Sequence, residues 1–234
     1  MKPIKDIRIY RSRIPNINGN PLPSESHFTN DPHYATIRRI AMKLNERGFS
    51  MGDFDHLYIN FTTCCVEGGV AFAKRSIDIY HPWFRYMDIH IDDTLYDKLD
   101  GTETEADFRE TLRLLELALN KATSPEDPKA AATIRAAMEE ALELGEQMRV
   151  RYKEKRTTTR RAVIFLRCAD DGWFFPLLQV HDAEGDLLFE TDLPKTIDLM
   201  SLGEIQVSAK RVTVKPRQNS IAEYLGLKPI TFHY

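Results

Sequence analysis

Apolar residues recur along this chain with two different periods, and the change of period divides the chain into sections. From Pro32 to Gly48 the spacing is helical, and a proline at the start and a glycine at the end are typical helix boundaries. Residues 54–91 and 160–234 instead contain short runs of β-forming residues separated by turns, which predict strands. The pattern therefore predicts one N-terminal helix and two β-rich segments.

A second helical pattern occupies residues 103–153, between the two β-rich segments. Apolar residues keep helical spacing over 104–123 and again over 127–153, and only a short proline-containing segment separates the two runs. We therefore expect a central antiparallel helical hairpin. The strands of 54–91 are expected to form an antiparallel meander. The predicted fold is one α+β domain over 1–234, with mainly antiparallel sheet, one N-terminal helix and the inserted hairpin.

Composition narrows the class of protein further. The chain has 234 residues, of which 42% are hydrophobic and 29% charged, as is usual for soluble globular proteins. No run approaches the roughly 20 apolar residues of a membrane span, and the first residues contain no apolar segment typical of a secretory signal. Three cysteines, two of them adjacent, do not form a disulfide framework. We expect a cytoplasmic protein that does not contact membranes.

The net charge of −3 is distributed unevenly along the chain. Residues 1–49 contain nine Lys or Arg against four Asp or Glu, and 149–234 contain fourteen against eleven, whereas 50–148 contain nine against twenty. Such a one-signed section attracts an oppositely charged partner, although solvated outer helix faces produce the same pattern. If it binds a partner, the candidate contacts on the helical section are Glu103, Glu105, Glu110, Glu139 and Glu143.

The segment RYMDIHIDD (85–93) places three potential metal ligands at alternate positions, namely Asp88, His90 and Asp92. On a strand these side chains share one side, opposite Met87 and Ile89, and their chemistry suits a divalent metal. Neighbouring residues on one side of a strand are nearly 7 Å apart, so one straight strand rarely brings three ligands to one ion. The pattern favours the hydrated face of a half-buried strand over a metal site.

The segment from Tyr80 to Tyr86 combines aromatic residues with arginine around a proline. These residue types carry binding hot spots in protein interfaces, and they also fill core corners beside proline turns. As binding anchors the candidates are Tyr80, His81, Trp83, Arg85 and Tyr86.

Motifs of known chemistry are missing from the sequence. It contains no nucleophile elbow, zinc-protease helix, phosphate-binding loop or zinc spacing, so we assign no catalytic residue, metal or cofactor. The basic stretches 153–161 and 210–217 lack interleaved aromatic residues, and the sequence pI is about 6.2, which disfavours nucleic acid as a partner.

Two segments, RIPNINGNPLPSESHF (13–28) and KRSIDIYHPWFRY (74–86), are similar to uncharacterised bacterial cytoplasmic proteins associated with the immunity proteins of polymorphic toxin systems. The resemblance covers about the first hundred residues and includes no catalytic motif. It implies an inhibitory protein that neutralises a toxin domain by binding it, and the acidic section suits a basic toxin surface. The alternative hypothesis is a metal-dependent hydrolase that uses Asp88, His90 and Asp92.

Overall fold

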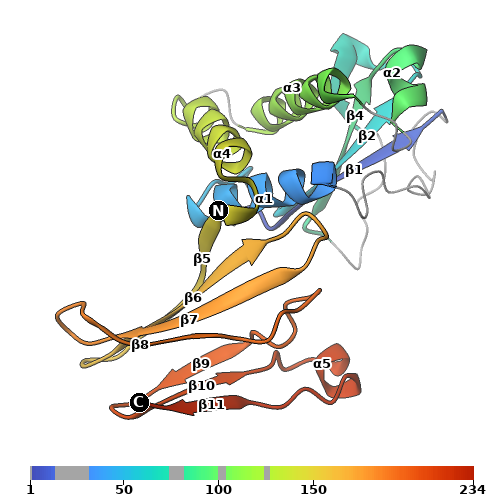
Figure 1. Cartoon of the computed structure of the whole chain (residues 1–234). Helices are drawn as coiled ribbons and strands as arrows, with labels where there is room; N and C mark the ends of the chain where they lie inside the picture. Colours follow the sequence, from blue (N-terminus) through green and yellow to red (C-terminus); the bar gives the residue numbers. More distant parts are fainter. Residues whose placement is uncertain (1, 14–31, 74–81, 100–103, 124–126) are drawn as a thin grey trace. The chain divides into compact units, whose positions relative to one another are not determined.

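The computed structural model describes residues 2–13, 32–73, 82–99, 104–123 and 127–234. The chain forms two compact units, Met1–Gly145 and Glu146–Tyr234, coloured blue to yellow-green and yellow to red in Figure 1. The described residues form three sheets, one mixed and two antiparallel, and five α-helices, which confirms an α+β fold. That the two units act as a single domain stays a prediction.

The first unit contains a four-stranded mixed sheet with the order β1-β2-β4-β3. Its strands are β1 (Asp6–Ser12), β2 (His56–Thr62), β4 (Phe84–His90) and β3 (Val70–Phe72). β1, β2 and β4 are parallel, and only β3 is antiparallel to its neighbour. The expected antiparallel meander over 54–91 is therefore wrong. The chain between β2 and β4 is long enough for the crossover that parallel strands need, and β3 pairs on the far side of β4.

The N-terminal helix is confirmed as α1 (Pro32–Glu46), which connects the parallel strands β1 and β2. Its inward positions Ile37, Ile40 and Leu44 are fully buried, and α1 packs against β1. Gly48 adopts a φ of 71°, a left-handed conformation that favours glycine after a helix end, as the sequence predicts.

The two faces of this sheet differ in chemistry. One face carries the fully buried apolar side chains of Ile9, Ile59 and Met87, which lie side by side on β1, β2 and β4. The opposite face carries a cluster of three buried tyrosines, Tyr10, Tyr58 and Tyr86. Burial raises the pKa of the Tyr58 hydroxyl well above its usual value, even though the nearby Arg8 acts in the opposite direction. Both faces of this sheet are therefore partly buried, although the alternation of polar and apolar residues in the sequence predicts one buried face and one hydrated face.

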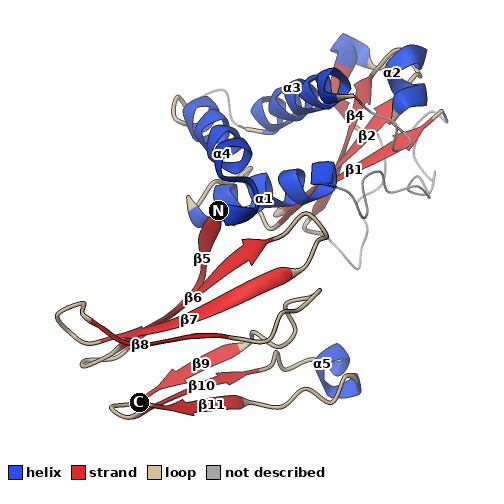
Figure 2. Ribbon diagram, viewed as in Figure 1, coloured by secondary structure: helices blue, strands red, loops and turns tan. Residues whose placement is uncertain are grey.

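Three further helices complete the first unit: α2 (Asp93–Lys98), α3 (Glu105–Ala122) and α4 (Ala130–Leu144) (Figure 2). α3 contacts β3, β4 and α4, and α4 contacts α1. The two consecutive helices α3 and α4 confirm the helical section, but its predicted end at residue 153 is wrong. A short 3₁₀ turn, η2 (Gly145–Gln147), follows α4 because Gly145 takes a positive φ of 48°. Residues 149–156 form a strand.

The second unit consists of two antiparallel sheets. The first is a meander of β5 (Arg149–Arg156), β6 (Arg161–Cys168), β7 (Phe174–His181) and β8 (Leu187–Asp192). The second has the order β11-β10-β9 and contains β9 (Glu204–Val207), β10 (Arg211–Lys215) and β11 (Ile230–His233). A short helix, α5 (Ser220–Tyr224), lies between β10 and β11. The last strand, β11, attaches the C-terminal residues to this sheet, because Phe232 pairs with Val212.

Regular alternation decides how the second unit is packed. Along β7 every second residue from Phe174 to Val180 is buried, and the residues between them are half-buried. Strand β9 of the second sheet contacts β5 and β6 of the meander, and Ile205, Val212 and Val214 of the second sheet are buried, as in a two-layer sandwich (Figure 2). Phe189 on β8 stacks on Tyr234, with ring centroids 5.6 Å apart, which joins the two sheets at one edge. The opposite side of the meander faces away from the second sheet, and we call it the outer face of the meander.

Candidate partner-binding site

Asp88, His90 and Asp92 do not converge on one point. Asp88 is only 8% exposed, and its carboxylate accepts a hydrogen bond from Asn60 Nδ2 at 2.9 Å. His90 is exposed, and its ring nitrogen Nδ1 lies 3.0 Å from the carbonyl oxygen of Cys64, which accepts. The predicted hydrated strand face is therefore right for His90 and wrong for Asp88, because neighbouring strands of the mixed sheet enclose Asp88 on both sides.

Asp92 lies beyond the end of β4 and begins a helix. Its carboxylate accepts a hydrogen bond from the backbone N–H of Leu95 at 2.7 Å, which caps α2. Within the parts of the chain that the structure describes, no three His, Cys, Asp or Glu side chains are grouped so that they could hold a metal ion.

The aromatic segment 80–86, which runs into β4, lies partly outside the described residues, which do not include Tyr80 and His81. Tyr86 is buried in the tyrosine cluster, with its ring centroid 5.6 Å from that of Tyr58. Arg85 donates hydrogen bonds to Asp53 at 2.8 Å and to the carbonyl of Pro82, while Trp83 is half-buried. Arg85 and Tyr86 also line a hollow of about 440 Å³ with Phe54, Phe72 and Phe84. The segment thus has both a packing role and an accessible edge.

The acidic candidates on the helices fall into two groups, and Glu103 lies outside the described residues. On α3, Glu105 forms an ion pair with Arg109 at 3.7 Å, and Glu110 forms one with Arg113 at 2.6 Å. On α4, Glu139 and Glu143 are exposed, and among the described residues neither has an ion-pair partner. Leu142 lies beside Glu143 and is 51% exposed.

A hollow of about 480 Å³ joins two of the regions that the sequence singled out separately, and we call it the charged hollow. Its carboxylates come from three places along the chain: Asp92 at the start of α2, Asp107 in the first turn of α3, and Glu110 one turn later. Its other polar lining residues are His90, Thr94, Lys98 and Arg113, and Leu95 and Leu114 contribute apolar surface. The hollow lies at the carboxyl end of β4, where the chain leaves the strand and continues into α2.

Ion pairs fix two of the three carboxylates. Lys98 donates to Asp107 at 2.8 Å, and Arg113 donates to Glu110. The hydrogen bond from Arg113 holds the pKa of Glu110 below its usual value, although burial and the negative charge of Asp92 act in the opposite direction. Asp92 has no ion-pair partner among the described residues. The hollow therefore carries one carboxylate charge that nothing described in the chain neutralises.

Asp107 gives this region a testable dependence on pH. The hydrogen bonds from Lys98 and then Thr104 lower the pKa of Asp107 to about 2. Because the unfolded pKa of an aspartate is about 3.9, the stabilisation from Asp107 is complete above that pH and is lost as pH falls towards 2. We expect the stability difference between the wild type and Asp107→Asn to shrink between pH 5 and pH 2 in urea unfolding. A difference that stays constant over that range would contradict this assignment.

Lys98, Asp107 and Arg113 were missed as site residues by sequence reasoning. Thr104 and Asp107 form a capping box at the start of α3, in which each side chain accepts a hydrogen bond from the backbone N–H of the other residue. That spacing is visible in the sequence and would have fixed the helix start and the direction of Asp107. Helix α2 was also missed, since six residues are too few for a periodic pattern.

Comparison with known proteins does not assign this site. No protein family, curated protein or solved structure matches the chain. In the part of the chain that the structure describes, no helix is both long enough and apolar enough to span a membrane.

Proposed function

We propose that this chain is a protein-binding inhibitor, and that its charged hollow receives a Lys or Arg side chain of a basic partner. The sharpest form of the proposal is an immunity protein that neutralises a basic toxin domain. The observation that carries it is the convergence of Asp92, Asp107 and Glu110 around one hollow, where Asp92 is the one carboxylate of the three without an ion pair to any described residue.

The charges support this proposal at short and at long range. A partner ammonium or guanidinium beside the exposed carboxylate of Asp92 would form a charge-assisted hydrogen bond, which is stronger than a hydrogen bond between neutral groups. The surrounding section 50–148 has nine basic against twenty acidic residues, so its field attracts a basic surface before contact. Glu139 and Glu143, exposed on α4, belong to that section and contribute to its field.

The test uses two substitutions of the same kind. Asp92→Asn removes the charge in the hollow and keeps the helix cap, because asparagine caps helices as well as aspartate does. Asp127→Asn is the matched control, since exposed Asp127 also accepts a hydrogen bond from a backbone N–H, that of Lys129, at the start of α4. A basic partner is recovered from the native cell with the wild-type chain, purified, and its binding kinetics are measured against each variant.

We expect Asp92→Asn to weaken binding of the recovered partner at least tenfold, because one hydrogen bond to a charged group is lost. Asp127→Asn should weaken binding less than threefold. Association should slow as salt concentration rises, because the Debye length falls below about 10 Å above 0.1 M. Co-expression should neutralise the partner if it is toxic. Equal effects of the two variants, or an association rate that ignores ionic strength, would contradict the proposal. A stoichiometric metal ion in the purified protein would favour the hydrolase hypothesis instead.

A further inference from the structure

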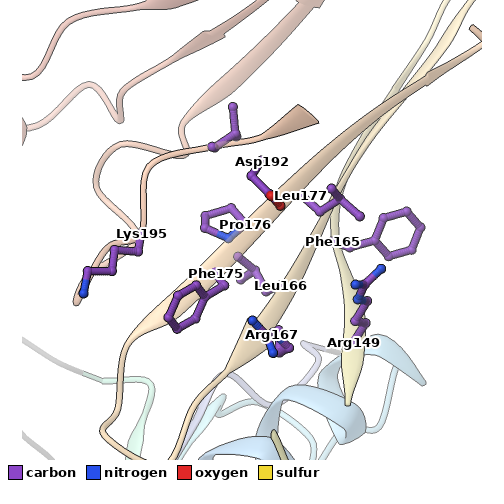
Figure 3. A pocket seen from close by; sticks show the side chains of 10 residues that line it. Arg149, Phe165, Leu166, Arg167, Phe175, Pro176, Leu177, Asp192 and Lys195 are labelled. Carbon is purple, nitrogen blue, oxygen red and sulfur yellow. The ribbon is translucent and has the colours of Figure 1, made fainter. Parts of the chain in front are cut away.

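The outer face of the β5–β8 meander contains another hollow, of about 290 Å³, whose chemistry differs from that of the charged hollow. Its lining includes three cations, Arg149, Arg167 and Lys195, two aromatic rings, Phe165 and Phe175, and one carboxylate, Asp192 (Figure 3). We call it the basic–aromatic hollow. It belongs entirely to the second unit and is independent of the charged hollow.

Strand register explains why these side chains meet. Arg167 on β6 lies opposite Arg149 on β5 and Phe175 on β7, so these three side chains form one row across the sheet. Phe165 and Leu177 form the next row, two residues along the strands. The residues between the rows point into the sandwich and are buried, whereas Phe165, Arg167 and Phe175 are half-buried and Arg149 is exposed. Residues from three strands are thus gathered on one accessible surface.

Cations lie over aromatic rings at two places on or beside this surface. The guanidinium carbon of Arg167 is 4.9 Å from the centroid of the Phe175 ring, and Lys195 Nζ is 4.6 Å from the centroid of the half-buried Trp173 ring. Such cation–π contacts hold a long side chain in a defined orientation. The guanidinium of Arg167 is thereby held beside the Phe175 ring, and a guanidinium is itself a planar group on which a base can stack.

We propose that the basic–aromatic hollow binds single-stranded nucleic acid. Bases of a single strand stack on aromatic rings and guanidinium planes, and its phosphates are neutralised by nearby lysine and arginine side chains. With three cations and one carboxylate, the lining of the hollow has a net positive charge, which attracts a phosphate backbone. A duplex hides the faces of its bases, so rings on a flat sheet face suit an unpaired strand.

The occupant is a strand and not a free nucleotide, because the structure contains two separate cation–aromatic pairs, Arg167–Phe175 and Lys195–Trp173. Two stacking positions suit two successive bases of one polymer. The sequence pattern disfavoured nucleic acid because the basic stretches contain no aromatic residues. In the fold, Arg167, Phe175 and Lys195 come from different strands and loops, so a linear pattern does not reveal them.

The test measures fluorescence anisotropy of a labelled 12-nucleotide oligo(dT) with the full-length chain, with unlabelled oligonucleotide, unlabelled TMP and unlabelled duplex as competitors. Two variants change the hollow: Arg167→Gln removes a cation, and Phe175→Leu removes a ring while keeping an apolar side chain. Lys210→Gln is the matched control, because Lys210 is exposed in the turn between β9 and β10 of the same unit.

We expect each hollow variant to weaken oligonucleotide binding about tenfold, and Lys210→Gln to weaken it less than twofold. With three cations engaged, raising salt from 50 to 200 mM should weaken binding roughly 20-fold. The unlabelled oligonucleotide should compete far better than TMP or duplex. Three results would overturn the proposal: no binding at 50 mM salt, competition by TMP as strong as by the oligonucleotide, or equal losses in the control and hollow variants.

Discussion

Replacing Phe61 by alanine should lower the free energy of unfolding of the first unit by about 3–5 kcal/mol. Phe61 lies on the central strand β2, opposite Arg11 on β1 and Ile89 on β4, and its side chain is fully buried. Parallel strands enclosed on both sides cannot close around the space that a lost phenyl ring leaves, so a cavity adds to the lost transfer free energy. The substitution should also destabilise the sheet near the carboxyl end of β4, where the charged hollow lies.

Phe72→Ala is the control for this prediction. Phe72 is on the edge strand β3 of the same sheet and points to the same face, but it is 43% exposed, so the substitution should cost less than about 1.5 kcal/mol. Hydrogen exchange followed by mass spectrometry separates the two units. Exchange should accelerate in residues 56–62 and 84–90 of Phe61→Ala and remain unchanged in 161–181. Similar losses from both substitutions would mean that burial in this sheet does not decide stability.

Replacing Gly203 by alanine should destabilise the second unit by about 3 kcal/mol, the upper end of the cost of overpacking. A Cβ atom at this position would lie 2.3 Å from the carbonyl oxygen of Pro216 and 2.5 Å from the backbone nitrogen of Arg217. Backbone atoms cannot rotate away as the end of a side chain can, so the strands β9 and β10 must move apart. The hydrogen bond from Gly203 N–H to the carbonyl of Lys215, at 2.7 Å, would weaken with them.

Gly226→Asn is the control, because it adds a larger side chain where there is room. Apart from Gly226 itself and its two neighbours in the chain, no described heavy atom would lie within 4 Å of a Cβ at this position, and its φ of 62° is one that asparagine tolerates. We expect this variant to unfold within about 1 kcal/mol of the wild type, measured by urea denaturation with tryptophan fluorescence. If Gly203→Ala were as stable as Gly226→Asn, the close approach of the two backbones would not be a real constraint.

The sequence identified some residues of the charged hollow but not the hollow itself. Asp92 and Glu110 were both candidates, but for separate reasons, one as a metal ligand and the other as part of an acidic helix. Only the fold brings them to one hollow, because β4, α2 and α3 meet at the carboxyl end of β4. Conversely, Asp88 shares a strand side with His90 in the sequence pattern, yet pairing with β2 and β3 on either side buries it.

Local interactions explain what the sequence by itself determined. Helix α1 follows from apolar spacing between Pro32 and Gly48, and α3 has its start in the Thr104–Asp107 capping box, so residues a few positions apart are enough. The strands of the second unit follow from alternation between turns in the same way, with β5 as the exception. That strand was assigned to a helix because an apolar pattern continues past Gly145, where the positive φ ends α4.

Tertiary structure alone decided which strands pair and which side chains meet. The parallel pairing of β2 with β4 depends on contacts between residues nearly thirty positions apart, and the row Arg149, Arg167 and Phe175 depends on the register of three strands. A strand presents the same alternating pattern to a parallel or an antiparallel neighbour, so its sequence does not specify the partner. The basic–aromatic hollow is formed by such distant pairings, and the charged hollow by the packing of α2 and α3 at the end of β4. Neither arrangement is visible in the periodicity of the sequence.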